Sequence, residues 1–132
     1  MSKQAKLTPV EWEIMESVWA IGKRVTARDV HNHAFPNGEK AYTTVQTILN
    51  KLHQKGFLKC EKLGMVNYFS AKKSRTMMLK EEILSVSRQL FHGSVPDMAN
   101  FLIDTGDIGL KEIREIKQFL ELKEKELEDE SS

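Results

Sequence analysis

The sequence contains few of the residues that cross-link a fold or bind a metal. Only one of its 132 residues is a cysteine, Cys60, which excludes an internal disulfide and a zinc site built on cysteines. No apolar run approaches the roughly 20 residues of a membrane span, and the N-terminal MSKQAKL lacks the apolar segment of a signal peptide. We therefore expect a cytoplasmic protein that binds no cofactor and does not insert into membranes.

Residue groupings typical of active sites are also absent. The four histidines and Cys60 show no spacing that would place a nucleophile beside a base, and there is no glycine-rich phosphate loop. His31 and His33, two apart on an expected helix, point roughly 200° away from each other and cannot share a metal ion. The sequence therefore argues against an enzyme.

What is present is an ordinary globular composition with an uneven distribution of charge. Hydrophobic residues make up 40% of the chain, enough for one domain or for a small domain with an appendage. Residues 1–73 contain 12 basic and 6 acidic side chains, whereas residues 74–132 contain 8 and 13. The basic front half is expected to contact an anion.

The stretch from Tyr42 to Gly56 has the pattern of a helix with two different faces. One face is an apolar stripe: Val45, Ile48, Leu49 and Leu52. The opposite side carries short polar groups and little charge: Thr43, Gln46, Thr47, Asn50, Lys51 and Gln54. Such donors and acceptors suit base edges in a DNA major groove. The alternative, an ordinary solvated helix face, is usually richer in Lys and Glu.

Two further helices are expected before this one. Thr8 and Glu11 predict a capping box for a helix that ends at Gly22 and buries Ile14, Met15, Val18 and Trp19. Lys23–Val25 is expected to be extended, with a single strand pairing. Thr26 and Asp29 predict a second cap. Thr43 with Gln46 offers a third for the two-faced helix, and the alternative is that this helix already begins at Ala41 or Tyr42.

After Gly56, two short β-type runs are joined by a turn at Leu63–Met65, which predicts a hairpin. Three helices followed by a hairpin is the layout of a winged helix-turn-helix, with one helix in the major groove and the wing at the neighbouring backbone. We expect bases to be contacted from the polar helix face by Thr43, Gln46, Thr47, Asn50 and Lys51. We expect phosphates to be contacted by Tyr42, Lys59 and Lys62, with Lys72 and Lys73 as further candidates for phosphate contacts.

From Ser74 onward the sequence predicts further helices: one to His92-Gly93, one from Val95 to about Ile103 and one from Leu110 to Leu127, with a frayed tail at residues 128–132. Three helices in so short a segment form a poor core by themselves, so a second copy is expected to cover them. The alternative is that they fold back onto the front domain. The expected dimer contacts are Leu79, Ile83, Val86, Leu90, Phe101, Leu102, Ile113, Ile116 and Leu120.

The predicted fold class is therefore mainly α with a small antiparallel β-hairpin. Residues 1–73 are expected to form the winged-helix DNA-binding domain, and residues 74–132 a helical dimerisation domain. The expected partners are double-stranded DNA and a second copy of the chain.

Several strings together resemble one known family, the penicillinase and methicillin-resistance repressors (the BlaI/MecI family of winged-helix regulators). The resemblance is carried by LTPVEWEIMESVW, AYTTVQTILNKLHQKGFL and VNYFS, and more loosely by NFLIDTGDIGLKEIREIKQFLE. These strings span nearly all of residues 7–122, and the second is the most specific.

The resemblance implies a homodimeric repressor that binds an inverted repeat. In the best-known branch, an antibiotic-sensing membrane metalloprotease system leads to cleavage of the repressor at an Asn-Phe bond in its dimerisation region. Asn100-Phe101 stands at the corresponding place here. The alternative is that Phe101 is simply an interface residue. Antibiotic resistance as the regulated trait is implied by the resemblance alone.

The chain also departs from the family. It has Ala41-Tyr42-Thr43 where some relatives have Ser-Pro-Lys, so its operator need not be theirs, and it lacks the C-terminal Cys-x-Cys pairs of the copper-responsive branch. Two alternative functions remain. A protein-interaction module would need an aromatic or Arg anchor on the outer face of the two-faced helix, and Tyr42 is the one residue there that comes close to this requirement. A regulator relieved by a small ligand would need a polar cluster in an apolar setting, and the sequence shows none.

Overall fold

The computed structural model describes residues 6–131. Residues 1–5, which belong to the N-terminal MSKQAKL segment discussed above, and Ser132 of the tail lie outside the described residues. The chain forms two compact units that divide between Ile83 and Leu84, within α4 (Arg75–Phe91). The boundary expected from the sequence, between residues 73 and 74, lies just before α4. As a division of function it stays a prediction.

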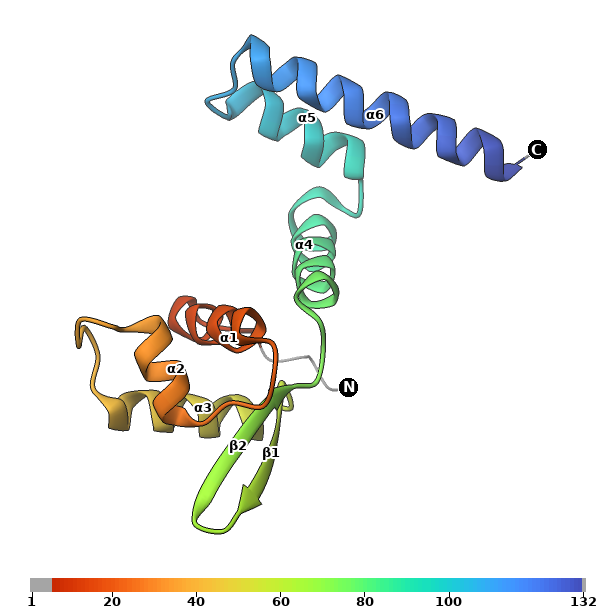
Figure 1. The fold of residues 1–132 in the computed structure, drawn as a ribbon. Helices are drawn as coiled ribbons and strands as arrows, with labels where there is room; N and C mark the ends of the chain where they lie inside the picture. Colours follow the sequence, from red (N-terminus) through yellow and green to blue (C-terminus); the bar gives the residue numbers. More distant parts are fainter. Residues whose placement is uncertain (1–5, 132) are drawn as a thin grey trace. The chain divides into compact units, whose positions relative to one another are not determined.

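The first unit has three helices followed by a β-hairpin (Figure 1). The helices are α1 (Pro9–Ile21), α2 (Ala27–Ala34) and α3 (Tyr42–Gln54). β1 (Leu58–Leu63) pairs antiparallel with β2 (Val66–Ala71). Val25 forms an isolated bridge with Phe69, which confirms the expected strand pairing after α1. The predicted fold class, mainly α with a small antiparallel hairpin in a winged helix-turn-helix layout, is confirmed.

Local signals set the helix ends as the sequence predicts. At α1, the Glu11 amide donates to Thr8 Oγ1 at 3.2 Å and the Thr8 amide donates to Glu11 Oε1 at 2.8 Å. Thr26 and Asp29 form the same box at α2. Gly22, with a φ of 79°, ends α1 in the left-handed region, where a residue without Cβ is favoured.

One hydrophobic core joins the helices to the base of the hairpin. It includes the expected buried residues of α1 and α3 together with residues of α2, the hairpin and α4: Ile14, Met15, Val18, Val30, Val45, Ile48, Leu49, Leu52, Leu58, Phe69 and Met78. Trp12 and Trp19 pack half-buried against it, and Trp19 Nε1 donates to the Lys73 carbonyl at 3.0 Å. This core fixes α3 on one side and leaves its other side to solvent.

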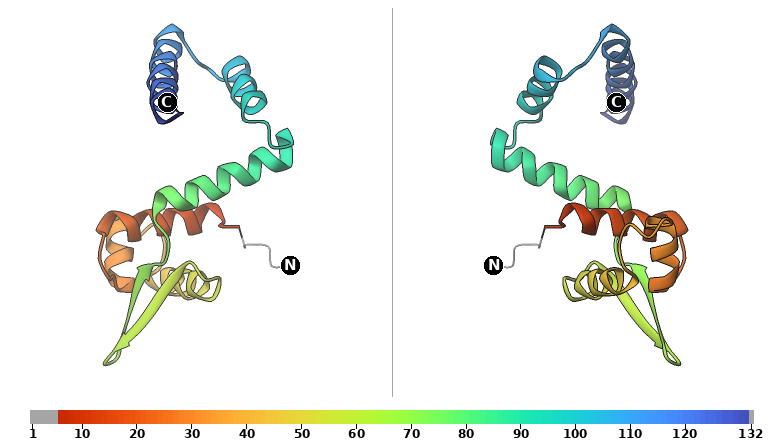
Figure 2. Two further views of the ribbon diagram at one scale, coloured as in Figure 1. Left: turned by 90° about the vertical axis from the view of Figure 1, so that its right-hand side faces the viewer. Right: turned by 90° about the vertical axis from the view of Figure 1, so that its left-hand side faces the viewer.

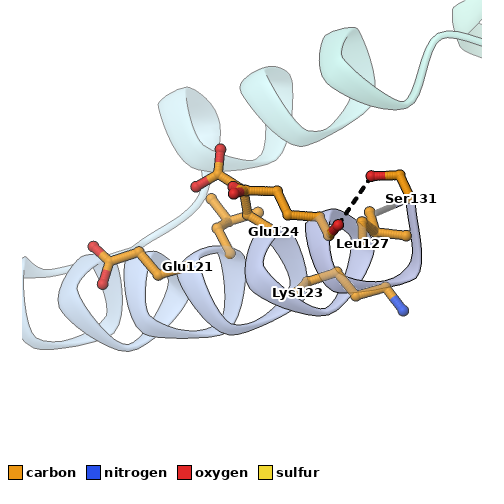
Figure 3. Close-up of a pocket in the computed structure, with 7 residues that line it drawn as sticks. Glu121, Lys123, Glu124, Leu127 and Ser131 are labelled. Carbon is orange, nitrogen blue, oxygen red and sulfur yellow. Dashed lines mark hydrogen bonds between the residues drawn. The ribbon is translucent and has the colours of Figure 1, made fainter.

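The second unit contains the rest of α4, followed by α5 (Val95–Thr105) and α6 (Leu110–Ser131). Ser94 caps α5 as expected, accepting a hydrogen bond from the Asp97 amide at 3.2 Å. Neither α5 nor α6 has a buried residue, and most of their large apolar side chains lie exposed. The expected frayed tail is wrong for the described residues: α6 continues to Ser131, whose Oγ donates to the Glu128 carbonyl (Figure 3). Its many Glu and Lys residues favour helix.

Candidate nucleic-acid interface

The two faces of α3 differ as the sequence predicts. The four residues of the apolar stripe are all buried. The opposite face is exposed to solvent and consists of Thr43, Gln46, Thr47, Asn50 and Lys51, with Tyr42 half-buried at the first turn. The fold therefore presents a row of short hydrogen-bonding side chains on one side of a well-anchored helix. Their contacts with bases stay a prediction.

The capping box expected between Thr43 and Gln46 does not form. α3 begins one residue before Thr43, and its N-cap is Ala41, whose side chain accepts no hydrogen bond. Gln46 Nε2 instead donates to the Tyr42 hydroxyl at 3.3 Å, and Thr47 Oγ1 donates to the Thr43 carbonyl at 3.0 Å. The amide oxygen of Gln46 and the hydroxyl of Thr43 are thus not used to cap the helix.

Two arginines lie on the chain's two tyrosines, and sequence reasoning missed both. Arg28 of α2 stands over the ring of Tyr42, with its guanidinium carbon 4.4 Å from the ring centroid. Arg24 lies 5.4 Å from the ring centroid of Tyr68 and binds the Glu61 carboxylate at 2.9 Å. The sequence spacing predicts neither contact, because α2 packs against α3, and the Arg24-Val25 link against β2, only in the folded unit. Arg28 brings a positive charge to the first turn of α3.

The wing carries its lysines on different faces. In a β-strand successive side chains alternate, so Lys59, opposite Ser70, and Lys62, opposite Asn67, project to opposite sides of the hairpin. Lys62 shares its side with the buried Leu58, the side on which the helical core lies. Of the two, Lys62 is better placed to act together with α3.

Lys73 and two of the histidines are tied into the fold, whereas Lys72 is exposed. Lys73 binds Glu81 at 3.0 Å. His31 Nε2 lies 2.7 Å from the Lys40 carbonyl, and His33 Nδ1 lies 2.9 Å from Ser17 Oγ. Within residues 6–131, no three His, Cys, Asp or Glu residues are grouped so as to hold a metal ion. Over the same range, none of the helices combines the length and apolarity needed to cross a bilayer.

An ion pair with a buried carboxylate fixes the C-terminal end of α3 to the start of α1. Lys55 Nζ lies 2.8 Å from both carboxylate oxygens of Glu11, whose surface is only 2% exposed. Burial raises the pKa of Glu11, but hydrogen bonds from Lys55 and Thr8 and the charge of Lys55 outweigh it, so the pKa lies below its ordinary value. This ion pair is formed only while α1 and α3 keep their relative positions.

The Asn100-Phe101 bond lies inside α5, and both residues are exposed. The Phe101 ring lies 5.6 Å from the ring of Phe91. Of the residues expected to form a dimer, Ile83, Leu90, Leu102 and Leu120 are exposed, whereas Leu79, Val86, Ile113 and Ile116 are half-buried. Their role in an interface stays a prediction.

Comparison with known proteins identifies the family. The chain is 28% identical over 118 residues to an uncharacterised 16.5 kDa protein from the ptsI 3′ region of Latilactobacillus sakei, covering 89% of this chain and 80% of that one. Bacillus licheniformis BlaI, in its monomeric form with the blaP half-operator, is 24% identical with a TM-score of 0.47, covering 58% of this chain and 92% of that one. The Streptococcus pyogenes adhesin competence repressor AdcR is 18% identical with a TM-score of 0.42, and the match covers 96% of this chain and 85% of that one. The penicillinase repressor family model matches residues 7–122, so the chain belongs to that family and is a DNA-binding transcriptional repressor, not an enzyme.

Proposed function

We propose that this repressor acts in the cytoplasm as a homodimer that binds an inverted-repeat operator. One observation carries the proposal: α3 is anchored by four buried apolar residues, and every outward residue from Thr43 to Lys51 that we expect at the bases is exposed and short or polar. A helix held this way can enter a major groove without rearranging. Phosphate contacts then fall to Tyr42, Lys59 and Lys62.

The unburied apolar residues of the second unit support dimerisation. Ile113, Ile116, Leu120 and Leu127 follow one another on α6 at spacings of three, four and seven, the pattern of a seam between paired helices. Leu120 is 64% exposed and Leu127 53%. Figure 3 shows Leu127 flanked by charged side chains on an open helix surface, an arrangement suited to a partner helix. A second copy supplies the same stripe, so the contact would be self-complementary.

We propose further that cleavage at Asn100-Phe101 by a sensor metalloprotease relieves repression. A protease binds its substrate in an extended form, so α5 has to open locally before the bond is cut. α5 has no buried residue, which places it at the low end of local stability. Cleavage separates α6 from the DNA-binding unit and thereby removes the dimer seam.

The proposal is tested by footprinting the purified full-length protein on its own promoter region at two salt concentrations. We expect protection of an inverted repeat whose half-sites lie one or two helical turns apart, with affinity falling as salt rises. Protection of nothing, with weak and salt-sensitive binding everywhere, would contradict an operator-binding function and favour a protein partner.

Gln46→Ala is expected to weaken operator binding by about 1–3 kcal/mol and to relax preference at one base pair of each half-site. The amide of Gln46 is exposed on α3 and touches only the Tyr42 hydroxyl among the contacts described above. Binding to a set of duplexes, each altered at one position, measures the effect. If the order of preference among these duplexes is unchanged, Gln46 does not contact a base.

Lys62→Ala is expected to weaken binding to all sequences alike. The loss of one phosphate contact lowers the slope of log affinity against log salt by about 1 per half-site. Lys80→Ala, an exposed lysine on α4, serves as the matched control. A slope equal to that of the native protein would place Lys62 away from the backbone.

A further inference from the structure

The tip of the wing is apolar. Leu63, Met65 and Val66 are 43%, 92% and 43% exposed. Leu63 pairs with Val66, so Gly64 and Met65 form a two-residue turn. Gly64 has a positive φ of 63°, whereas the φ of Met65 is not positive. This combination is that of a type II′ turn, in which glycine takes the first central position. This tight turn places Met65 at the extreme end of the hairpin.

The base of the hairpin is firmly attached to the rest of the first unit. Leu58 and Phe69 are buried at the base of the hairpin. The Val25 amide donates to the Phe69 carbonyl at 2.9 Å, and the Phe69 amide donates back to the Val25 carbonyl at 2.7 Å. Figures 1 and 2 show the turn projecting clear of α1, α2 and α3. Three apolar side chains are therefore held away from the core that could have buried them.

The charge and polarity of the side chains around the tip are complementary to DNA. Lys62 and its cross-strand neighbour Asn67 are both exposed directly behind the turn. The only acidic side chain of the hairpin, Glu61, is bound to Arg24 at 2.9 Å. Proteins that bind the minor groove commonly use Lys and Asn side chains together with apolar residues such as Met and Leu, which contact the sugars and insert at base steps.

We propose that the wing tip docks in the minor groove beside each half-site, with Met65 against the deoxyriboses and at a base step. This inference rests on the proposed operator binding and extends it, because it adds an apolar contact to the phosphate contacts of the wing. Such a contact depends on the shape and flexibility of the DNA. It favours an easily unstacked pyrimidine–purine step, TA or CA/TG, at a position where no side chain hydrogen-bonds a base.

The test compares Met65→Ala, Met65→Gln and Met65→Leu in the full-length protein on a duplex carrying the native footprint. Met65 is 92% exposed in a turn, so these variants keep the fold. Ala removes the side chain, Gln keeps its length but not its apolar character, and Leu keeps an apolar side chain. Met77→Ala, a half-exposed methionine on α4, is the matched control.

We expect the Ala and Gln variants to bind about tenfold more weakly, with an unchanged salt slope, because no phosphate contact is lost. Both should lose hydroxyl-radical protection of the sugars flanking each half-site. The Leu variant and the Met77→Ala control should behave like the native protein. Replacing the flanking TA or CA/TG step by a stiffer one should weaken the native protein and leave Met65→Ala unaffected.

Each contrary outcome has a separate meaning. Native-like affinity for all Met65 variants, with Gln46→Ala still defective, overturns the minor-groove contact and leaves operator binding intact. A reduced salt slope in Met65→Ala places the tip at phosphates. A change in sedimentation instead of DNA affinity assigns the tip to a second copy. Failure of the native protein to protect any repeat overturns the operator function itself.

Discussion

A fragment ending at Asn100 is expected to bind an operator with two half-sites about 10²–10⁴-fold more weakly than the intact chain, whereas its affinity for a single half-site should change little. The cut removes α6 and half of α5 but leaves the first unit whole, since every residue of the hydrophobic core lies between Ile14 and Met78. The intact dimer links two weak binding events, and the fragment makes each of them separately. Titration of duplexes with one and two half-sites measures the difference.

A matched variant keeps the full chain length. Leu120→Glu places a charge in the α6 stripe of both copies, where it would be desolvated and face its own counterpart. It should lose the same avidity as the fragment and sediment as a monomer. Leu122→Glu, a similarly exposed leucine outside that stripe, is the control. If the fragment binds the two half-sites as tightly as the intact protein, the α6 seam does not hold the repressor together.

Local signals made the front unit predictable. The Thr8–Glu11 and Thr26–Asp29 boxes and the Gly22 stop depend on residues within a few positions of each other, and all three form. The two faces of α3 follow from a 3.6-residue period, which the core then uses. At α3 the sequence left two starting points open, and the helix begins at the earlier one, Tyr42, so the Thr43 capping pattern lies inside the helix and is not used.

What the sequence could not reveal are contacts made across the fold. Arg28 meets Tyr42, and Lys55 meets Glu11, only after the helices have packed. The wing tip is a different case. Leu63-Gly64-Met65 was recognised as a turn, but three apolar residues around a turn predict neither burial nor exposure until the hairpin is seen to leave the core. The sequence therefore did not reveal the direction in which the hairpin leaves the core, and this direction depends on the pairing of Val25 with Phe69.

Lys55→Met is expected to destabilise the first unit by about 2–4 kcal/mol at pH 7, because it leaves a buried carboxylate without its cation. Glu11 is 2% exposed, and of the contacts described above only those with Thr8 would remain. Urea unfolding followed by tryptophan fluorescence reports on this site directly, since both tryptophans lie in α1. Arg75→Met, which breaks an exposed pair with Glu16, is the control and should leave the free energy of unfolding almost unchanged.

The pH dependence separates this ion pair from simple loss of packing. The Glu11 pKa is lowered in the folded protein, so the unfolded chain binds the proton more readily. The stabilisation is therefore fully present above the ordinary value of 4.5 and is lost as pH falls through the lowered pKa. Lys55→Met removes the hydrogen bond and the charge that lower the Glu11 pKa, so the Glu11 pKa is higher in the variant than in the native protein, and the variant gains less stability as pH rises. The gap between native protein and variant should thus widen from pH 4 to pH 7, and adding Glu11→Gln to the variant should remove the widening. A gap that is constant across this range would mean that Lys55 contributes packing rather than charge.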